Sequence, residues 1–464
     1  MTTLIENPIT PNLPLAGRWP LLGALPELVK NPVEFFAAAH QRHGDIYRLR
    51  LGPMQPVVLN HPRHAQHVLR DHAANYRKGG AMWESLRALL GNGLVVSEGD
   101  FWLRQRRMMQ PQFHRQRLAG LTDLMVNAMA ESLAGWAPAA GDGRAVNLLP
   151  AFNHLTMRVV IDTLFGTSMP RETMTEVADA MGYVLDYLMV GAATQGLPAW
   201  LPIPGKRRYR REIARADRIV YEIIAAARNS GGGAHHLLGM LLDVVDDQTG
   251  EGMSDKQLHD EVSTLVLAGY ETTSIALTWA FHYLTRDPAV MQKMQEEVDR
   301  VLGGRTPAFA DLPQLTYTRM VLQEVMRLRP PSYWLPRVAV EDDEIDGYAI
   351  PAGTEVISMT YMIHHHPDFW PEPDRFDPER FAEHGVRGSG GRHPFAFIPF
   401  GAGQRLCIGR DFAMMEGTLA LAMVMQRYRI APVAGRVAET GRSTTLRPKD
   451  GLWVHLAARD APAR

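Results

Sequence analysis

The residues with the clearest potential for chemistry lie in a glycine-punctuated stretch near the C-terminal end, from Phe400 to Gly409. This stretch contains Cys407, the only cysteine of the chain. An apolar segment from Asp411 to Tyr428 follows, which we expect to be helical, and the N–H groups and dipole at a helix N-terminus favour a thiolate. Glycines such as Gly401 let the backbone turn tightly and let a flat ligand lie against it. Arg405 can reach an anionic group on such a ligand.

A single cysteine in a turn is more often a small buried hydrophobe than a ligand, but the neighbours of Cys407 argue against that alternative. The pattern Phe-x-x-Gly-x-Arg-x-Cys-x-Gly, from Phe400 to Gly409, resembles the haem-binding loop of the cytochrome P450 family. The resemblance implies a haem b cofactor, iron protoporphyrin IX, with the Cys407 thiolate as the axial iron ligand. It also implies that Phe400, Gly401 and Arg405 contribute to haem binding.

A second group of residues lies in the middle of a long expected helix. The helix begins at Ser254, which opens a capping box, and ends before Pro288. Its centre, Ala-Gly-Tyr-Glu-Thr-Thr, is rich in poor helix formers, so we expect the hydrogen-bond ladder to open there. For Thr272 the structural alternative is a hydroxyl that bonds back to a carbonyl. The sequence resembles the family's oxygen-binding groove, which implies that Ala268 lies beside the haem, that Thr272 holds the water or peroxide that delivers protons, and that Glu271 relays them.

A third group resembles the family's structural network. Glu324 and Arg327 lie three residues apart on an expected helix and can pair directly. The alternative is a surface ion pair, worth less than about 1 kcal/mol. In the family, the matching glutamate and arginine join a further arginine, here Arg380, in a buried network that fixes the loop around the haem. The run from His364 to His366 looks like a metal cluster, but consecutive residues do not share a face, so we interpret it as structural or surface residues.

Three more residues offer donors for carboxylates. Trp102 and Arg106 lie four residues apart on one helix face, and a surface helix with a half-buried tryptophan is the alternative. The resemblance implies that both residues bind haem propionates, and that Arg337 pairs with a propionate from the segment that crosses the haem edge. Four nearby arginines predict either a basic surface that docks an acidic electron donor or a solvated charge cluster: Arg104, Arg107, Arg115 and Arg117.

Composition is that of an ordinary globular protein. The chain has 464 residues, with 46% hydrophobic and 21% charged residues. A formal net charge of -1 gives no reason to expect nucleic-acid binding. One cysteine permits neither an intramolecular disulfide nor the thiolate sets of zinc and iron–sulfur sites. Neither a signal peptide nor a transmembrane segment is evident, so we expect a cytoplasmic monomer without membrane attachment, which resembles the bacterial members of the family.

The expected fold class is mainly α, with a large helical body and small β-sheets as in the cytochrome P450 fold. The resemblance implies a single cytochrome P450 domain over residues 1–464, which begins with a proline-rich lead at residues 1–30. We expect strands at residues 46–51, 56–59, 348–350 and 354–359, where β-branched and apolar residues alternate with turn signals. Helices are expected to dominate between these strands.

The resemblance implies a haem-thiolate monooxygenase that inserts one oxygen atom of O2 into a lipophilic small molecule, by hydroxylation or epoxidation. Too few residues follow Cys407 for flavin-binding domains, and no dinucleotide fingerprint occurs elsewhere. We therefore expect electrons from a ferredoxin and its NAD(P)H-dependent ferredoxin reductase. Aryl coupling or desaturation by the same chemistry is an alternative. A haem gas sensor or electron carrier is another, against which the proton-delivery motif argues, and the same motif argues against peroxide-driven relatives.

By analogy with the family, four stretches are expected to line the substrate pocket: residues 82–96, 181–189, 265–272 and 333–335. They are largely apolar, so we expect a terpenoid, a polyketide or a fatty acyl chain as substrate. The same residues could form core instead, which is the commoner position of apolar side chains.

Overall fold

The computed structural model describes residues 13–52, 54–166, 169–194, 202–229, 236–243, 245–246, 248, 250–382, 392–441 and 444–459. The first 12 residues of the expected proline-rich lead lie outside this set. The chain divides into two compact units. We call Met1–Trp83 with Met326–Cys407 the sheet unit, and Glu84–Val325 with Ile408–Arg464 the helical unit.

The sheet unit holds a six-stranded sheet in the order β1-β2-β3-β9-β6-β4 and a two-stranded hairpin, β7-β8. The strands are β1 (Leu15–Ala16), β2 (Ile46–Leu49), β3 (Val57–Leu59), β4 (Tyr76–Arg77), β6 (Leu335–Ala339), β7 (Asp343–Ile345), β8 (Tyr348–Ile350) and β9 (Glu355–Ser358). β3 pairs parallel to β9, and β6 pairs antiparallel to β9. The four strands expected from the sequence are therefore confirmed as β2, β3, β8 and β9, with ends that differ by up to two residues.

Short helices accompany the sheet. They are α1 (Leu25–Lys30), α2 (Pro32–His43), α3 (Pro62–Gln66) and α15 (Thr360–His364), with the turns η1 (His67–Asp71), η2 (Ala73–Asn75), η5 (Pro378–Phe381), η6 (Pro394–Ala396) and η7 (Gly403–Arg405). One cluster of buried side chains joins the sheet to the segment that precedes Cys407. It contains Leu59 and Val356 from the strands, Ile363 from α15, and Phe395 and Ile398 from that segment. The loop of Cys407 is thereby anchored on the sheet.

The helical unit contains most of the helices. They are α5 (Gly99–Met109), α6 (Arg115–Ala134), α7 (Ala137–Asp142), α8 (Leu148–Phe165), α9 (Arg171–Ala193), α10 (Lys206–Asn229), α11 (Leu237–Asp243), α12 (Asp255–Leu284), α13 (Pro288–Leu302) and α16 (Arg410–Arg427), with η3 (Gln110–Phe113) and η4 (Phe309–Asp311). The helices α4 (Ala81–Leu90) and α14 (Thr316–Leu328) each continue across a boundary between the units. A small sheet, β10-β11-β5, is formed by β5 (Val146–Asn147), β10 (Tyr428–Pro432) and β11 (Trp453–Ala458).

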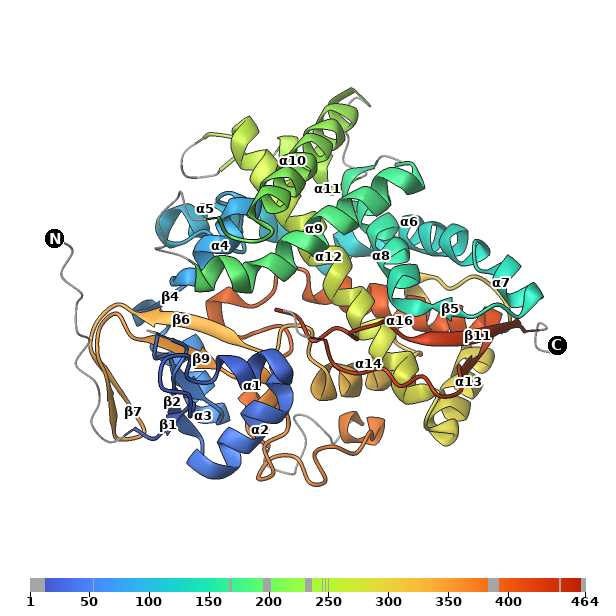
Figure 1. Cartoon of the computed structure of the whole chain (residues 1–464). Helices are drawn as coiled ribbons and strands as arrows, with labels where there is room; N and C mark the ends of the chain where they lie inside the picture. The colour runs from blue at the N-terminus through green and yellow to red at the C-terminus, as the bar shows by residue number, and fades with distance from the viewer. Residues whose placement is uncertain are drawn as a thin grey trace. The chain divides into compact units, whose positions relative to one another are not determined.

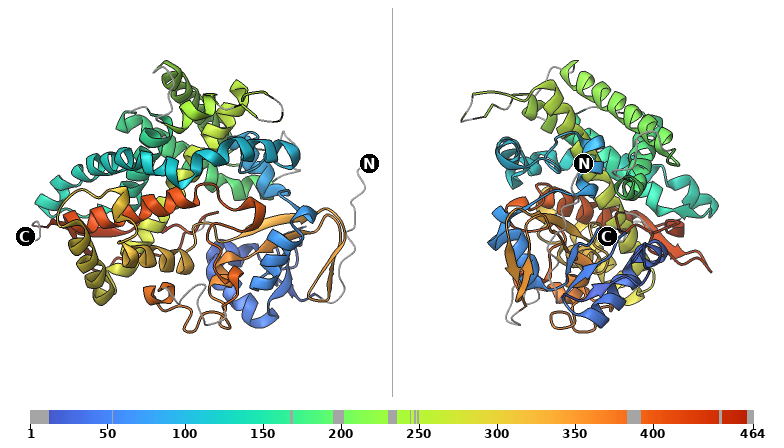
Figure 2. Two further views of the ribbon diagram at one scale, coloured as in Figure 1. Left: turned by 180° about the vertical axis from the view of Figure 1, so that it is seen from behind. Right: turned by 60° about the vertical axis from the view of Figure 1, so that its left-hand side comes forward.

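The long helix α12 is the centre of the helical unit. It begins as the sequence predicts, since Ser254 accepts the N–H of Gln257 and the Gln257 side chain accepts the N–H of Ser254. It packs along α8 (Figure 1), where the hydroxyl of Thr156 donates to the carbonyl of Tyr270 over 2.9 Å. The helix α16 packs against both α12 and α6, and it lies beside α6 in Figure 2. The predicted helical body with small sheets is confirmed.

Among the described residues, none of the helices combines the length and the apolar character that a bilayer-crossing segment needs.

Candidate active site

Cys407 stands at the end of a loop that is closed by its own hydrogen bonds. The N–H of Cys407 donates to the carbonyl of Phe400 over 3.0 Å, and the N–H of Leu406 donates to the carbonyl of Gly403 over 3.1 Å. The thiol is exposed and takes part in no disulfide, although cysteine is among the residue types most often buried. The thiol is therefore accessible to a ligand and is not a core side chain.

Two glycines give this loop its shape. Gly401 and Gly403 have φ angles of +70° and +67°, a region that L side chains enter at a cost. A Cβ on Gly403 would lie 1.8 Å from the carbonyl oxygen of Leu69 in η1, so the close approach of the two segments requires glycine. A Cβ on Gly401 would meet nothing nearer than the Arg405 carbonyl oxygen at 4.0 Å. The loop thus combines an exposed thiol with an open backbone position, which suits a flat cofactor such as haem.

The buried side chain of Arg327 supports this loop from within the sheet unit. Its guanidinium is fully buried and donates to the carbonyls of His364, Pro373 and Arg375 over 2.9, 2.7 and 3.2 Å. The imidazole of His364 in turn accepts the N–H of Ile398 over 2.8 Å. Burial, together with the nearby Arg327 charge, lowers the pKa of His364 to about 3. A neutral imidazole therefore links the guanidinium to the segment that leads to Cys407.

The other two residues of the expected network differ in burial. Glu324, on α14, is fully buried, which excludes the alternative of a surface ion pair. Arg380, on η5, is half-buried and donates to the carbonyl of Glu372 over 2.9 Å.

Between its two ends, the helix α12 is accessible at its centre and buried elsewhere. Ala268 is exposed and Gly269 and Thr272 are half-buried, whereas the residues around them are mostly buried. The helix α12 runs without interruption through these residues, and an opening of its hydrogen-bond ladder stays a prediction. The Thr272 hydroxyl donates to the Ala268 carbonyl over 2.8 Å. Glycine at position 269 allows α8 to approach α12 closely, because a Cβ there would lie 2.7 Å from Cγ2 of Val160 on α8.

Glu271 points away from that accessible strip into the protein and is 7% exposed. Its carboxylate accepts the hydroxyl of Thr445 over 3.2 Å. Burial raises the pKa of Glu271 to about 7, while the charge of Arg447 acts in the opposite direction. Neither Thr445 nor Arg447 was predictable as a partner of Glu271, because both lie more than a hundred positions further along the chain in a segment without a recognisable motif.

The helix α5 carries Trp102 and Arg106. The indole is buried, and Nε of Arg106 donates to the side-chain oxygen of Gln110 over 3.1 Å. Beside them, Arg104 and Arg107 both pair with Asp246, at 3.3 and 2.6 Å, and the Asp246 side chain is fully buried. These two arginines therefore hold the protein together. They do not form the free basic surface that the sequence suggested as one possibility.

The remaining two arginines of that group are arranged differently. The guanidinium of Arg115 lies over the ring of Phe309 at 5.5 Å, and Arg117 is exposed. Of the four arginines expected to form a basic surface, only Arg115 and Arg117 are therefore available for one.

Arg337 lies on β6 of the sheet unit and is 6% exposed. It donates to its neighbour's carbonyl at Pro336 over 2.7 Å, and the indole N–H of Trp83 donates to the same oxygen over 3.2 Å. The guanidinium lies 6.0 Å from the centre of the Trp83 ring. Arg405, in η7, is half-buried in the same unit.

The histidine run 364–366 is buried throughout, so its interpretation as structural residues is supported. Nε2 of His366 and Nε2 of His40 lie 3.1 and 2.8 Å from the same oxygen of Asp45. These three residues could hold a metal ion by distance. However, Nδ1 of His366 accepts the N–H of Asp368, which leaves the proton on Nε2. That nitrogen is then a donor to Asp45, and the group is a hydrogen-bonded cluster.

A second such group consists of His67, His72 and Asp343. Nε2 of His67 lies 2.7 Å from Asp343, and the two imidazoles stack at 3.9 Å with 13° between their planes. The lone pairs of stacked rings lie in parallel planes and do not converge on one ion. This group is also a hydrogen-bonded cluster.

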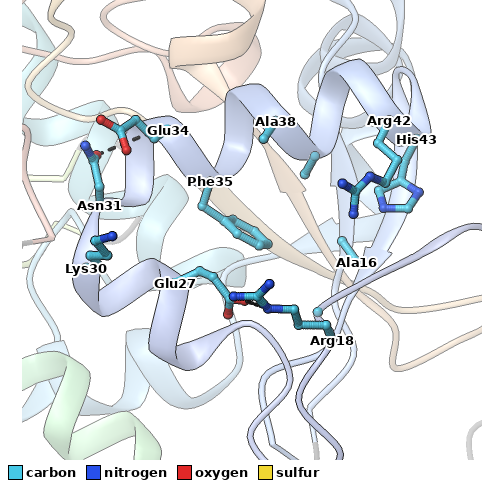
Figure 3. A pocket seen from close by; sticks show the side chains of 12 residues that line it. Ala16, Arg18, Glu27, Lys30, Asn31, Glu34, Phe35, Ala38, Arg42 and His43 are labelled. Carbon is cyan, nitrogen blue, oxygen red and sulfur yellow. Dashed lines mark hydrogen bonds and ion pairs between the residues drawn. The ribbon is translucent and has the colours of Figure 1, made fainter.

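A cleft of 340 Å³ opens in the sheet unit between the segment after β1 and the helices α1 and α2. Figure 3 shows Phe35 pointing into it from α2, and Arg18 lying along Glu27, with which it pairs at 2.7 Å. None of the residues expected at the active site lines this cleft. Its mixed charges show no preference for one class of ligand.

Comparisons with known proteins find relatives over nearly the whole chain. The family model described as cytochrome P450 matches residues 11–452. The chain is 38% identical over 424 residues to a cyclooctat-9-en-7-ol 5-monooxygenase of Streptomyces melanosporofaciens, which covers 90% of this chain and 89% of the relative. It is 31% identical over 414 residues to a pentalenene oxygenase of Streptomyces avermitilis, covering 89% and 90%. The crystal structure of the cytochrome P450DA heme domain matches with a TM-score of 0.87 at 26% identity, over 97% of this chain and 98% of that one.

Proposed function

The chain belongs to the cytochrome P450 family of haem-thiolate monooxygenases, and we propose that its substrate is a terpenoid. The expected P450 fold is confirmed by the solved relative. When bound, the haem supplies O2 activation and the insertion of one oxygen atom into the substrate. The observation that carries this proposal in the structure is the exposed thiol of Cys407 on its open glycine loop.

Each residue of the expected haem site has a proposed role. Cys407 is the iron ligand, and a thiolate there is favoured because a helix, α16, begins three residues later. Trp102, Arg106 and Arg337 bind the propionates, since an indole N–H and two guanidiniums are donors suited to carboxylates. Arg405, which lies in the loop of Cys407, also binds the anionic groups of the haem. Phe400 and Gly401 lie against the haem plane, and Glu324, Arg327 and Arg380 keep the loop in place.

Proton supply is the proposed role of the α12 residues. Thr272 is half-buried, so its hydroxyl can hold a water molecule beside the accessible Ala268. Glu271, with a pKa of about 7, can take up and release a proton near neutral pH. The two side chains together would deliver protons from the protein interior to the site where O2 binds.

Two relatives support the terpenoid class by their names, a cyclooctat-9-en-7-ol 5-monooxygenase and a pentalenene oxygenase. The stretches expected at the substrate pocket are apolar, as a hydrocarbon skeleton requires. In α9 the side chains of Met181, Val184 and Leu188 are buried, while the last residue of that stretch, Met189, has no described side chain. A polyketide or a fatty acyl chain is the second substrate class.

We also propose that a ferredoxin and an NAD(P)H-dependent ferredoxin reductase supply the electrons. The chain contains neither a recognisable flavin-binding motif nor a dinucleotide-binding motif. The family model spans both compact units, which supports a single P450 domain. The proposed working form is a cytoplasmic monomer, by analogy with bacterial relatives.

The test begins with the absorbance spectrum of the purified, reduced protein in carbon monoxide. We expect the red-shifted Soret band of a thiolate-ligated haem, and we expect its loss in Cys407→Ala and Cys407→His. A panel of terpenoids, polyketides and fatty acids is then titrated into the ferric protein. A shift caused by displaced water for terpenoids alone supports the substrate class, and a shift for fatty acids alone contradicts it.

Aryl coupling or desaturation remains the second candidate reaction, because it uses the same residues. Product analysis with ferredoxin, reductase and NAD(P)H separates the candidates, since hydroxylation and epoxidation add one oxygen atom and the others add none. A gas sensor would consume no NAD(P)H in response to substrate.

A further inference from the structure

The proton-delivering carboxyl of Glu271 is connected to the protein surface through the C-terminal segment. The carboxyl is 7% exposed, and it accepts the hydroxyl of Thr445, which is itself half-buried. The segment is fixed on α12, because the indole N–H of Trp279 donates to the carbonyl of Leu446 over 2.6 Å. Glu271, Thr445 and the helix α12 all belong to the helical unit. Thr445 is therefore held where a partly solvent-accessible hydroxyl reaches a buried acid.

Two positions further on, Arg447 is held at the surface. Its guanidinium contacts both carboxylate oxygens of Asp186 on α9, at 2.5 and 2.6 Å. The side chains of Arg447 and Asp186 are 26% and 45% exposed. One guanidinium nitrogen, Nη2, makes both contacts, so the carboxylate of Asp186 holds this end of the Arg447 side chain. Asp186 thus keeps the cation of Arg447 from moving fully onto Glu271.

The charges around Glu271 are few. The Arg447 charge lowers the pKa of Glu271 and the Asp186 charge raises it, while burial has the largest effect. The buried hydroxyl of Tyr270 donates to the carbonyl of Ala178. From α8, Thr156 and Asn153 face α12 without charge.

On the α16 side, Glu416 is a fully buried titratable group. Burial raises the pKa of Glu416 well above its usual value. The Glu416 side chain also forms a hydrogen bond with Thr273, which lies two positions after Glu271 on α12. A neutral Glu416 adds no charge near Glu271. The protonation of Glu271 is therefore governed by burial, by the charge of Arg447, by the hydrogen bond from Thr445 and by the charge of Asp186.

Thr445 and Arg447 have different roles in proton transfer, because their side chains differ in chemistry. A threonine hydroxyl donates and accepts, so it can pass a proton on, whereas a guanidinium in a protein does not release one. When Glu271 gives its proton to the Thr272 side of α12, the resulting carboxylate accepts the Thr445 hydroxyl. Thr445 then passes its hydroxyl proton to the Glu271 carboxylate. At the same time the Thr445 oxygen takes a proton from water at the surface. One proton moves inward and no electron is transferred.

We propose that Thr445 is the solvent-side step of proton supply to Glu271, and that Arg447, held by Asp186, is the positioning residue that keeps Glu271 able to release its proton. This inference rests on the proposed role of Glu271 in proton delivery. Thr445, Arg447 and Asp186 carry no part of the resemblance to the family's motifs.

The test uses the haem-loaded enzyme and the infrared band of protonated Glu271, identified by its absence in Glu271→Gln. Arg447→Met removes the cation, so the midpoint of Glu271 should rise by about one pH unit. Asp186→Asn releases Arg447 toward Glu271, so the midpoint should fall. Thr445→Val removes a hydrogen bond to the carboxylate and should raise the midpoint, while Thr445→Ser should leave it unchanged.

A second measurement follows proton transfer itself. With ferredoxin, reductase and a substrate that shifts the haem spectrum, Thr445→Val should slow NAD(P)H oxidation about a hundredfold and enlarge the solvent deuterium isotope effect. Thr445→Ser should restore both. A purely structural role for Thr445 would lower stability without changing the isotope effect, and that outcome overturns the proposal.

The two proposals fail in different ways. If the wild-type protein lacks the thiolate-haem band, the proposed function is wrong. If that band is intact while Arg447→Met, Asp186→Asn and Thr445→Val all titrate like the wild type, only the proton route is wrong.

Discussion

Arg327 and His364 meet through one hydrogen bond, in which the fully buried guanidinium donates to the histidine carbonyl over 2.9 Å. The imidazole of the same histidine accepts the N–H of Ile398 over 2.8 Å. The end of α14, the short helix α15 and the segment leading to Cys407 are thereby joined in the sheet unit. A change at Arg327 should consequently alter the position of the Cys407 thiolate, because His364 links the guanidinium to the segment that leads to Cys407.

Arg327→Met should therefore destabilise the protein and loosen the haem. The substitution leaves buried carbonyls without their donor, which costs about 3–5 kcal/mol. We expect a lower midpoint of denaturation and a loss of haem during gel filtration.

The matched control is Arg375→Met, because Arg375 pairs with Glu372 on the surface, where the side chains are 61% and 70% exposed. Such a pair contributes less than about 1 kcal/mol. Equal effects of the two substitutions would contradict the structural role of Arg327.

Gly403→Ala tests the shape of the cysteine loop. The new Cβ would lie 1.8 Å from the Leu69 carbonyl oxygen, at a φ of +67°. Because backbone and not a flexible side chain is in the way, the loop must move, and we expect weak haem binding by a protein whose helical content is unchanged. Circular dichroism and haem titration measure the two effects. Gly435→Ala is the control, since its φ is +74° with nothing within 4 Å, so that only the backbone strain of about 1–2 kcal/mol applies.

Local patterns were the part of the structure that the sequence predicted well. The capping box at Ser254 was correctly placed, because a cap is decided by residues within one turn. The strands around Val57 and Val356 were also found from local alternation. What each helix touches was not predictable in the same way.

The errors came from contacts between distant segments. The sequence showed Gly269 as a poor helix former, whereas its reason is the approach of Val160 from α8. Arg104 and Arg107 looked like surface charges because their partner, Asp246, lies about 140 positions away and has no motif around it. The acid of the candidate site was recognised as Glu271, but Thr445 was invisible, since one threonine among polar residues carries no pattern.

The contact between Gly269 and Val160 allows a double-mutant test. Gly269→Ala should destabilise the protein even though alanine is the better helix former by about 1 kcal/mol, because the new Cβ lies 2.7 Å from Val160 Cγ2. Val160→Ala alone should cost about 1–3 kcal/mol through the cavity it leaves. The double variant should be more stable than the sum of the two effects predicts. Additive effects in urea denaturation would show that α8 and α12 do not approach as closely as described.

Glu261 gives the clearest pH dependence of stability. It lies on α12, is 1% exposed, and accepts the N–H of Leu94 over 3.0 Å. Burial raises the pKa of Glu261 from 4.5 to about 8. Between these two values the folded protein holds a proton that the unfolded chain has released, so stability must fall as the pH rises through this window. Each unit of difference corresponds to about 1.4 kcal/mol.

Glu261→Gln removes the ionisation while keeping an oxygen for the Leu94 N–H. We therefore expect the variant to lose less thermal stability than the wild type between about pH 5 and about pH 8, and to exceed it at the upper end. Melting temperatures across this range are the measurement. Glu222→Gln is the control, because Glu222 is exposed on α10 and pairs with Arg218. If the curves of Glu261→Gln and wild type ran parallel, the buried carboxyl would have to be ionised throughout, and the loop at Leu94 would then be held by a charge and not by a neutral acid.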